Sequence, residues 1–242
     1  MRAGEIRLPR IAWTRVAREP LPARFLERPN RFTAVVELAG GGRVRAHLPN
    51  PGRLTGTLTP GCELLLDGPY PPPRALPYTV VAAREGRTLV CTITTYANRL
   101  FPVLLDLGLF PELPPGKPAS EVLHGRSRFD FRLAEVLIEV KSVTLRRSGG
   151  WGLFPDAVTA RGARHVRELA ELARRGRPAA ILFLAQRGDV RRIAPAKDVD
   201  PAFAAALAKA AQAGVILLGC AVRMRRLGAA AARRVPVSLD YE

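Results

Sequence analysis

Asp130, Glu139 and Lys141 are the residues whose types and spacing could do chemistry in this chain. Residues 128–133 alternate apolar and polar side chains, and residues 136–143 form a mostly apolar run with several β-branched side chains. Both patterns predict strands. If the two strands form a hairpin, the two carboxylates and the ammonium group lie on one face of a sheet, because side chains alternate along a strand.

The register of this hairpin decides whether the two carboxylates meet. A two-residue turn at 134–135 would place Leu133 opposite Val136 and Asp130 opposite Glu139. Residues directly opposite in an antiparallel pair have Cβ atoms about 4.5–5.5 Å apart. Two-residue turns favour Asn or Gly, so Ala-Glu is an unusual turn sequence. A four-residue loop would keep the pairing, whereas a loop of odd length would break it.

Two carboxylates that face each other destabilise a hairpin unless something neutralises them. A hard cation with oxygen ligands would do so, and Mg²⁺ is held by one or two carboxylates together with substrate phosphate. Only 4 of the 38 basic residues are lysines, so a lysine at 141 indicates that a compact charge is needed there. The alternative is an edge strand in which Lys141 and Glu139 form a structural salt bridge.

The charge of the chain predicts a polyanionic partner. The net charge is +17, from 38 basic and 21 acidic residues. A positive charge of this size most often indicates nucleic-acid binding. Genome composition would explain the preference for arginine over lysine, but it would not explain the excess of basic over acidic residues.

The cysteines and the lengths of the apolar runs indicate in which cellular compartment the protein is expected. Cys62, Cys91 and Cys220 show no CxxC spacing, so neither a zinc site nor a disulfide framework is predicted. The first residues do not resemble a signal peptide, and no apolar run reaches transmembrane length. These features predict a cytoplasmic protein without membrane association. The oligomeric state stays open, and a homodimer is one option.

The chain divides into two expected domains, residues 1–84 and residues 85–242. Short strand patterns separated by Gly and Pro turns indicate a small basic β-barrel in the first. An antiparallel scaffold without a binding role is the alternative for that domain. The second domain alternates strand and helix patterns, which predicts an α/β domain with a mixed sheet. Its expected helices are 97–107, 156–175 and 201–213, and its expected buried strands are 179–185 and 215–222.

Several long strings closely resemble the sugar fermentation stimulation protein A (SfsA) family. They are Leu48-Pro-Asn-Pro-Gly52, Ala97-Asn-Arg-Leu100, Ser120-Glu-Val122, Ser127-Arg-Phe-Asp-Phe131, Glu139-Val-Lys-Ser-Val-Thr-Leu145 and the segment 154–169. The resemblance implies an N-terminal OB-fold followed by a C-terminal domain like the PD-(D/E)xK nucleases. It also implies DNA binding and a role in the regulation of sugar (maltose) metabolism.

The resemblance also assigns the site residues. Carried over residue by residue, the nuclease-like motif falls on Glu121, Asp130, Glu139 and Lys141, and the helix string supplies Arg161 and His165. We therefore expect Asp130, Glu139 and the Val140 carbonyl to bind Mg²⁺ or Mn²⁺. Lys141 would position the attacking water and stabilise charge on phosphate, and Glu121 would support the site.

These expectations predict a DNA-binding protein with a metal-dependent phosphodiesterase (nuclease) site and without strong sequence specificity. The side chains expected to contact DNA are Arg128, Arg146, Arg147, Arg161 and His165. The main alternative is a non-catalytic DNA-binding regulator of sugar (maltose) metabolism with a vestigial nuclease-like pocket. A small-molecule enzyme that uses the same metal site is a third interpretation.

Overall fold

Five strands close into a barrel in the computed structural model, which describes residues 4–125 and 127–241. They are β2 (Leu21–Asn30), β3 (Thr33–Leu38), β4 (Arg43–His47), β5 (Glu63–Asp67) and β6 (Tyr78–Glu85). They pair in the order β4-β3-β2-β5-β6, and a parallel pairing of β4 with β6 closes the barrel. Buried side chains such as Val36, Leu64 and Val80 fill its interior. The predicted OB-fold-like barrel is confirmed.

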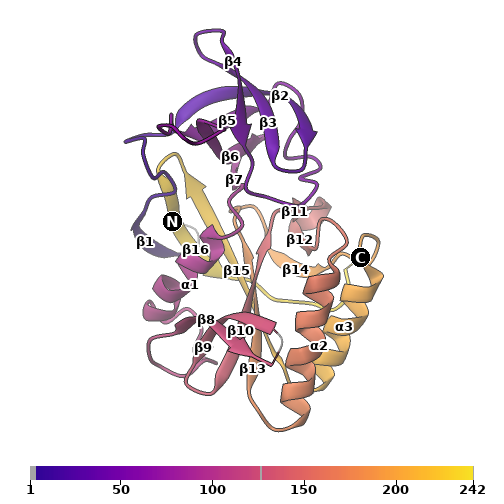
Figure 1. Ribbon diagram of the computed structural model, residues 1–242. Coiled ribbons are helices and arrows are strands. Elements are labelled where there is room, and N and C mark those ends of the chain that lie inside the picture. Colours follow the sequence, from indigo (N-terminus) through magenta and orange to yellow (C-terminus); the bar gives the residue numbers. More distant parts are fainter. Residues whose placement is uncertain (1–3, 126, 242) are drawn as a thin grey trace.

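A seven-stranded mixed sheet forms the centre of the second domain (Figure 1). Its strands, in spatial order, are β1 (Ile6–Ile11), β16 (Gly228–Arg234), β15 (Ile216–Arg225), β13 (Ala179–Ala185), β10 (Val136–Val143), β9 (Ser127–Leu133) and β8 (Ala119–His124). The three central strands, β10, β13 and β15, are parallel, and the outer neighbours are antiparallel. This confirms the predicted mixed sheet.

Helices cover both faces of this sheet. Helix α1 (Tyr96–Asp106) buries Phe101 in the same apolar cluster as Phe131 and Ile138. Helices α2 (Ala160–Arg174) and α3 (Pro201–Gln212) lie together on the opposite face (Figure 1) and share a second cluster with β13. None of the described helices is long and apolar enough to cross a membrane.

A small sheet lies at the barrel end of the larger domain. It consists of β11 (Leu145–Arg146), β12 (Trp151–Phe154) and β14 (Arg192–Pro195), with a short 3-10 turn at Ser148–Gly150. β11 follows directly from the end of β10, and β12 leads into the segment before α2. The small sheet therefore sets the path of the chain between Lys141 on β10 and the start of α2.

The helix predicted over 156–175 begins four residues later than expected, at Ala160. The Thr159 side chain caps it by accepting a hydrogen bond from the Gly162 N–H at 3.0 Å. Asp156 is not helical because its carboxylate is bonded elsewhere: it accepts from the backbone N–H of Leu54, in the barrel, at 3.2 Å. Val158, two residues before the helix, is 72% exposed.

Two strands belong to the sheet on the other side of the expected domain boundary, which lies between residues 84 and 85. β7 (Thr88–Cys91) pairs with β6 and extends the barrel sheet, whereas β1 pairs with β16 at the edge of the larger sheet. From β1 in the larger sheet, the chain thus passes through the barrel and returns to the larger sheet.

A buried arginine clamps the two parts. The Arg187 side chain is 1% exposed and donates to both oxygens of Glu85, on β6, at 2.9 Å. It also donates to both oxygens of Asp189 and to the Thr144 carbonyl. Because every donor group of the guanidinium has an acceptor, burying this charge is compatible with a stable interface.

Candidate active site

The hairpin formed by β9 and β10 has the predicted register. Leu133 lies opposite Val136, and the ladder continues to Phe131 opposite Ile138. Ala134, in the turn, adopts a left-handed conformation with φ of +48°. Alanine therefore occupies a turn position at which Asn or Gly is usually found. The register therefore survives an unusual turn because the apolar faces of both strands are buried.

The backbone pairing of β9 with β10 ends at Phe131, and the next contact between the two strands is made by the Asp130 side chain. Asp130 Oδ2 accepts a hydrogen bond from the Val140 N–H at 2.8 Å. Its other oxygen, Oδ1, accepts from the side-chain amide of Asn98, on α1, at 2.7 Å. The carboxylate is thereby fixed beside β10 at the level of Glu139.

Glu139 is 5% exposed and lies between two nitrogen-bearing side chains. Its Oε1 is 2.5 Å from Lys141 Nζ and 2.8 Å from His165 Nδ1. His165 is on α2, so the helix carries this contact to the strand. Glu139 Oε2 is buried and has no hydrogen-bond partner among the described residues. A buried carboxylate oxygen without a partner is costly, so this oxygen is open to a ligand.

The two carboxyl groups have opposite pKa shifts. Burial raises the pKa of Asp130, and the neighbouring Glu139 charge raises it further. Burial also acts to raise the pKa of Glu139, but the His165 hydrogen bond and the Lys141 charge outweigh it and hold that pKa below its usual value. The surroundings therefore favour the ionised form of Glu139 and disfavour the ionised form of Asp130.

These groups fit a hard divalent cation, although no three His, Cys, Asp or Glu side chains among residues 4–125 and 127–241 form a ready-made metal cluster. The open Oε2 of Glu139 and the strained charge pair with Asp130 are features that a cation would relieve. Mg²⁺ binds through one or two carboxylates and completes its ligands with water and phosphate, so two carboxylates suffice. The Val140 carbonyl belongs to the backbone between Glu139 and Lys141.

Glu121 stands apart from this cluster. It lies on β8 between the residues paired with Phe131 and Phe129, so it neighbours Asp130 along the sheet. Its backbone φ is +56°, and its exposed carboxylate is 3.5 Å from an Arg128 nitrogen. Glu121 and Arg128 thus form an exposed ion pair with each other at the edge of the sheet.

The other side chains expected to contact DNA differ in their surroundings. Arg161 is exposed on the first turn of α2. Arg146 and Arg147 form ion pairs with Asp189 at 3.2 Å and Asp198 at 2.8 Å. His165 is 2% exposed and faces Glu139.

Sequence reasoning did not single out three residues that shape the site. Asn98 holds Asp130, and its string 97–100 was already part of the family resemblance. Phe154 presents its ring 6.0 Å from Lys141 Nζ. Gln186 donates to Ser142 Oγ and to the Ile93 carbonyl, and only its position after an apolar strand could have indicated it.

Comparisons with known proteins agree over most of the chain. Residues 26–92 match the SfsA N-terminal OB domain, and residues 95–228 match the sugar fermentation stimulation protein RE domain. A sugar fermentation stimulation protein homolog of Pseudomonas paraeruginosa is 42% identical over 226 residues, which cover 89% of this chain and 96% of the relative. One from Moorella thermoacetica is 44% identical over 205 residues, covering 81% and 86%. The solved structure of Pyrococcus furiosus SfsA in complex with Ca²⁺ superposes with a TM-score of 0.83 at 27% identity, covering 94% of this chain and 99% of that one.

Proposed function

Because the chain belongs to the sugar fermentation stimulation protein family, we propose that it binds DNA and hydrolyses phosphodiester bonds at a divalent-cation site formed by Asp130 and Glu139. The observation that carries the proposal is Glu139 itself. A buried, ionised carboxylate with one open oxygen, beside a second carboxylate and a lysine, has the ligands and the charge that such a reaction needs.

The proposed cation is Mg²⁺ or Mn²⁺. The Pyrococcus furiosus relative is a complex with Ca²⁺, which is also a hard cation with oxygen ligands, and this supports a divalent ion in the family. When bound, such a cation lowers the pKa of a water ligand and polarises phosphate oxygens. Asp130, Glu139 and the Val140 carbonyl are the proposed protein ligands, and Glu121 is the carboxylate that could join them.

The remaining roles belong to side chains around the carboxylates. The Lys141 ammonium group carries three donors, so it can turn from Glu139 to a phosphate oxygen or an attacking water. His165 and Asn98 are positioning residues, because each holds one of the carboxylates by a hydrogen bond. The three free cysteines have no disulfide partner, which suits the reducing cytoplasm we propose as its compartment.

A second candidate function follows from the burial of the site. Glu139, Lys141 and His165 are each less than a tenth exposed. A polymeric substrate needs more open access than this, so the alternative is a DNA-binding regulator of sugar (maltose) metabolism in which the pocket does not turn over. Metal binding and DNA cleavage by a single variant separate the two functions.

The test is Glu139→Gln, which keeps the size of the side chain and removes its charge. Mn²⁺ and Ca²⁺ binding, measured by calorimetry, should weaken at least about tenfold. Cleavage of labelled single- and double-stranded DNA in Mg²⁺ or Mn²⁺ should be abolished, while DNA affinity stays unchanged. Glu135→Gln is the matched control, since Glu135 is exposed in the turn of the same hairpin.

The outcomes are distinct. Cleavage by wild type that chelator does not abolish, or cleavage by Glu139→Gln at the wild-type rate, would overturn the site. DNA binding without cleavage under any of the metals would support the regulator instead.

A further inference from the structure

A basic groove of about 440 Å³ lies between the barrel and the segment that leads into α2. Arg28, Arg31 and Arg53 line it from the barrel, and Ala157 and Val158 line it from the larger domain. No acidic side chain is among its described lining residues. The groove is therefore positively charged and lies at the junction of the two domains.

Arg28 is fixed in the floor of this groove. Its guanidinium donates to the backbone carbonyls of Arg31 at 2.7 Å, Arg53 at 2.8 Å and Asn50 at 2.9 Å. Burial lowers its pKa, although the nearby Asp156 charge acts in the opposite direction. No carboxylate of the described residues is within ion-pair distance of Arg28, and its Nε has no hydrogen-bond partner there. The charge is rigidly placed but not paired.

Arg31 and Arg53 add two exposed charges. Neither side chain has an ion-pair partner in the part of the chain that the structure describes. Exposed guanidinium groups that are free of carboxylates are available to bind phosphate bidentately.

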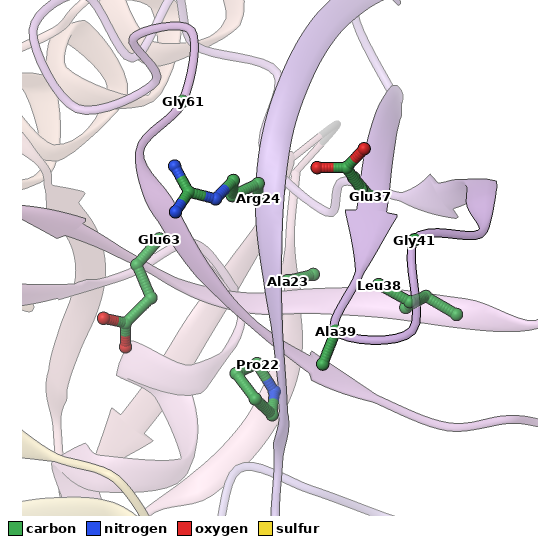
Figure 2. A pocket seen from close by; sticks show the side chains of 9 residues that line it. All are labelled: Pro22, Ala23, Arg24, Glu37, Leu38, Ala39, Gly41, Gly61 and Glu63. Atoms are coloured by element: carbon green, nitrogen blue, oxygen red, sulfur yellow. The ribbon is translucent and has the colours of Figure 1, made fainter.

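Two other surface pockets are less suited to a polyanion. One of them, on the barrel, has a volume of about 600 Å³. Figure 2 shows that Arg24 is accompanied there by the carboxylates of Glu37 and Glu63. These acids would repel phosphate.

A pocket of about 460 Å³ near the end of β15 contains more arginines, but most of them are already paired. Arg84 pairs with Glu63, Arg223 with Glu5, and Arg226 with Glu19. Phosphate binding there would compete with these carboxylates, whereas the three groove arginines form no ion pair with a carboxylate among the described residues.

We propose that the groove of Arg28, Arg31 and Arg53 holds the phosphate backbone of a nucleic-acid strand at the junction of the two domains. Val158, which is 72% exposed on the rim, supplies an apolar contact for a sugar or base. Val158 lies in the segment between Phe154, whose ring is 6.0 Å from Lys141 Nζ, and α2, which carries His165. A strand held in the groove would therefore lie against the segment that connects two parts of the candidate site, and in this respect the inference rests on the proposed function.

The test is the double variant Arg31→Ala/Arg53→Ala, which leaves the backbone carbonyls that hold Arg28 in place. Binding of fluorescein-labelled 20-nucleotide single- and double-stranded DNA is measured by anisotropy between 50 and 300 mM salt. The slope of log affinity against log salt should become shallower by about 0.7–0.9 for each phosphate that the variant no longer neutralises. At 150 mM salt, the loss of two such phosphate contacts should lower the affinity by about 10- to 1,000-fold.

The matched control is Arg10→Ala/Arg177→Ala. It removes the same charge from exposed positions on β1 and after α2, away from the groove. Thermal unfolding of both variants checks that they remain folded. A polyglutamate peptide as competitor tests whether any polyanion suffices.

Each result decides one question. If the groove variant and the control weaken DNA affinity equally, or if polyglutamate displaces DNA at equal charge concentration, the groove assignment is overturned. That outcome leaves the Glu139 test of cleavage and metal binding intact. If the wild-type protein binds neither the single-stranded nor the double-stranded DNA, the DNA-binding part of the proposed function fails together with the groove assignment.

Discussion

At the scale of single residues, the site shows how two carboxyl groups of the same kind acquire different properties. Glu139 has a hydrogen-bonding histidine and a lysine beside it, and its pKa is held low. Asp130 has only neutral donors bonded to it, from Asn98 and the Val140 backbone, so burial and the Glu139 charge raise its pKa. The difference lies in the partners and not in the carboxyl groups, as is general for paired acids in active sites.

The Gly52 position shows a second single-residue constraint. Its φ is not in the left-handed region, so an alanine would fit the backbone, but a Cβ there would lie 2.0 Å from Asp156 Oδ1. We predict that Gly52→Ala lowers the free energy of unfolding by about 1–3 kcal/mol, the usual cost of overpacking. Urea denaturation measures the change.

The cause of that destabilisation can be isolated with Asp156→Ala. In the double variant Gly52→Ala/Asp156→Ala the clash is gone, so the two destabilising effects should be clearly less than additive. Additive effects would show that the alanine acts through the loop backbone and not through the Asp156 carboxylate.

At the scale of elements, the turn between β9 and β10 is a poor local fit between sequence and structure. Ala134 has φ of +48°, a conformation that costs a non-glycine residue about 1–2 kcal/mol. We predict that Ala134→Gly raises the free energy of unfolding by up to about 1 kcal/mol, since glycine adopts this conformation freely but its chain entropy falls more on folding. Chemical denaturation measures the increase.

A decrease in stability for Ala134→Gly would mean that the alanine methyl group makes a contact that matters more than the backbone conformation. Glu135→Gly serves as the comparison, because Glu135 does not have a positive φ and should not become more stable.

The same hairpin shows how far the sequence predicts the elements. A two-residue turn predicted the register of Leu133 with Val136, and the alternating apolar residues of β9 agree with it because this register buries one face of that strand. The Asp130 side chain in the ladder position could not be predicted, since it depends on Asn98 from a distant helix. The late start of α2 has a similar cause: Asp156 is bonded to Leu54, 102 residues away, and local propensity contains no information about that contact.

At the scale of the whole molecule, the barrel and the larger domain share one apolar cluster, which includes Val81 of the barrel and Leu182 of the larger sheet, and a mostly buried charged contact adds to it. Arg187 is the centre of this contact, and Thr57 adds a hydrogen bond to Glu85. The sequence could predict a barrel and a mixed sheet from their separate patterns, but not this joint, because an Arg-Glu pair 102 residues apart leaves no periodic signal.

The joint makes stability depend on acid pH. Burial acts to raise the pKa of Glu85 and of Asp189, but the bonds and charge of Arg187 outweigh it and hold both pKa values below their usual range. A depressed pKa contributes stability above the unfolded-state pKa, near 4, and this contribution disappears as pH falls through the folded-state values. We therefore predict that the free energy of unfolding falls below about pH 4.5.

Glu85→Gln tests the origin of this acid sensitivity. The variant should be less stable than wild type at pH 7, and its stability should fall less between about pH 5 and pH 3, as followed by urea denaturation at each pH. Glu135→Gln, at an exposed turn, should retain the wild-type profile. Equal profiles for Glu85→Gln and wild type would place the acid-sensitive groups elsewhere.

The pairing of β1 with β16 has a consequence for synthesis on the ribosome. Ile6 lies opposite Ala232, so the first strand has no partner in its sheet until nearly all of the described chain has been made. The barrel contains its own ladder of strands and can fold while β1 waits. Closing a contact over such a long loop is slow. During translation, Ile6–Ile11 therefore lacks its partner strand until β16 has emerged from the ribosome.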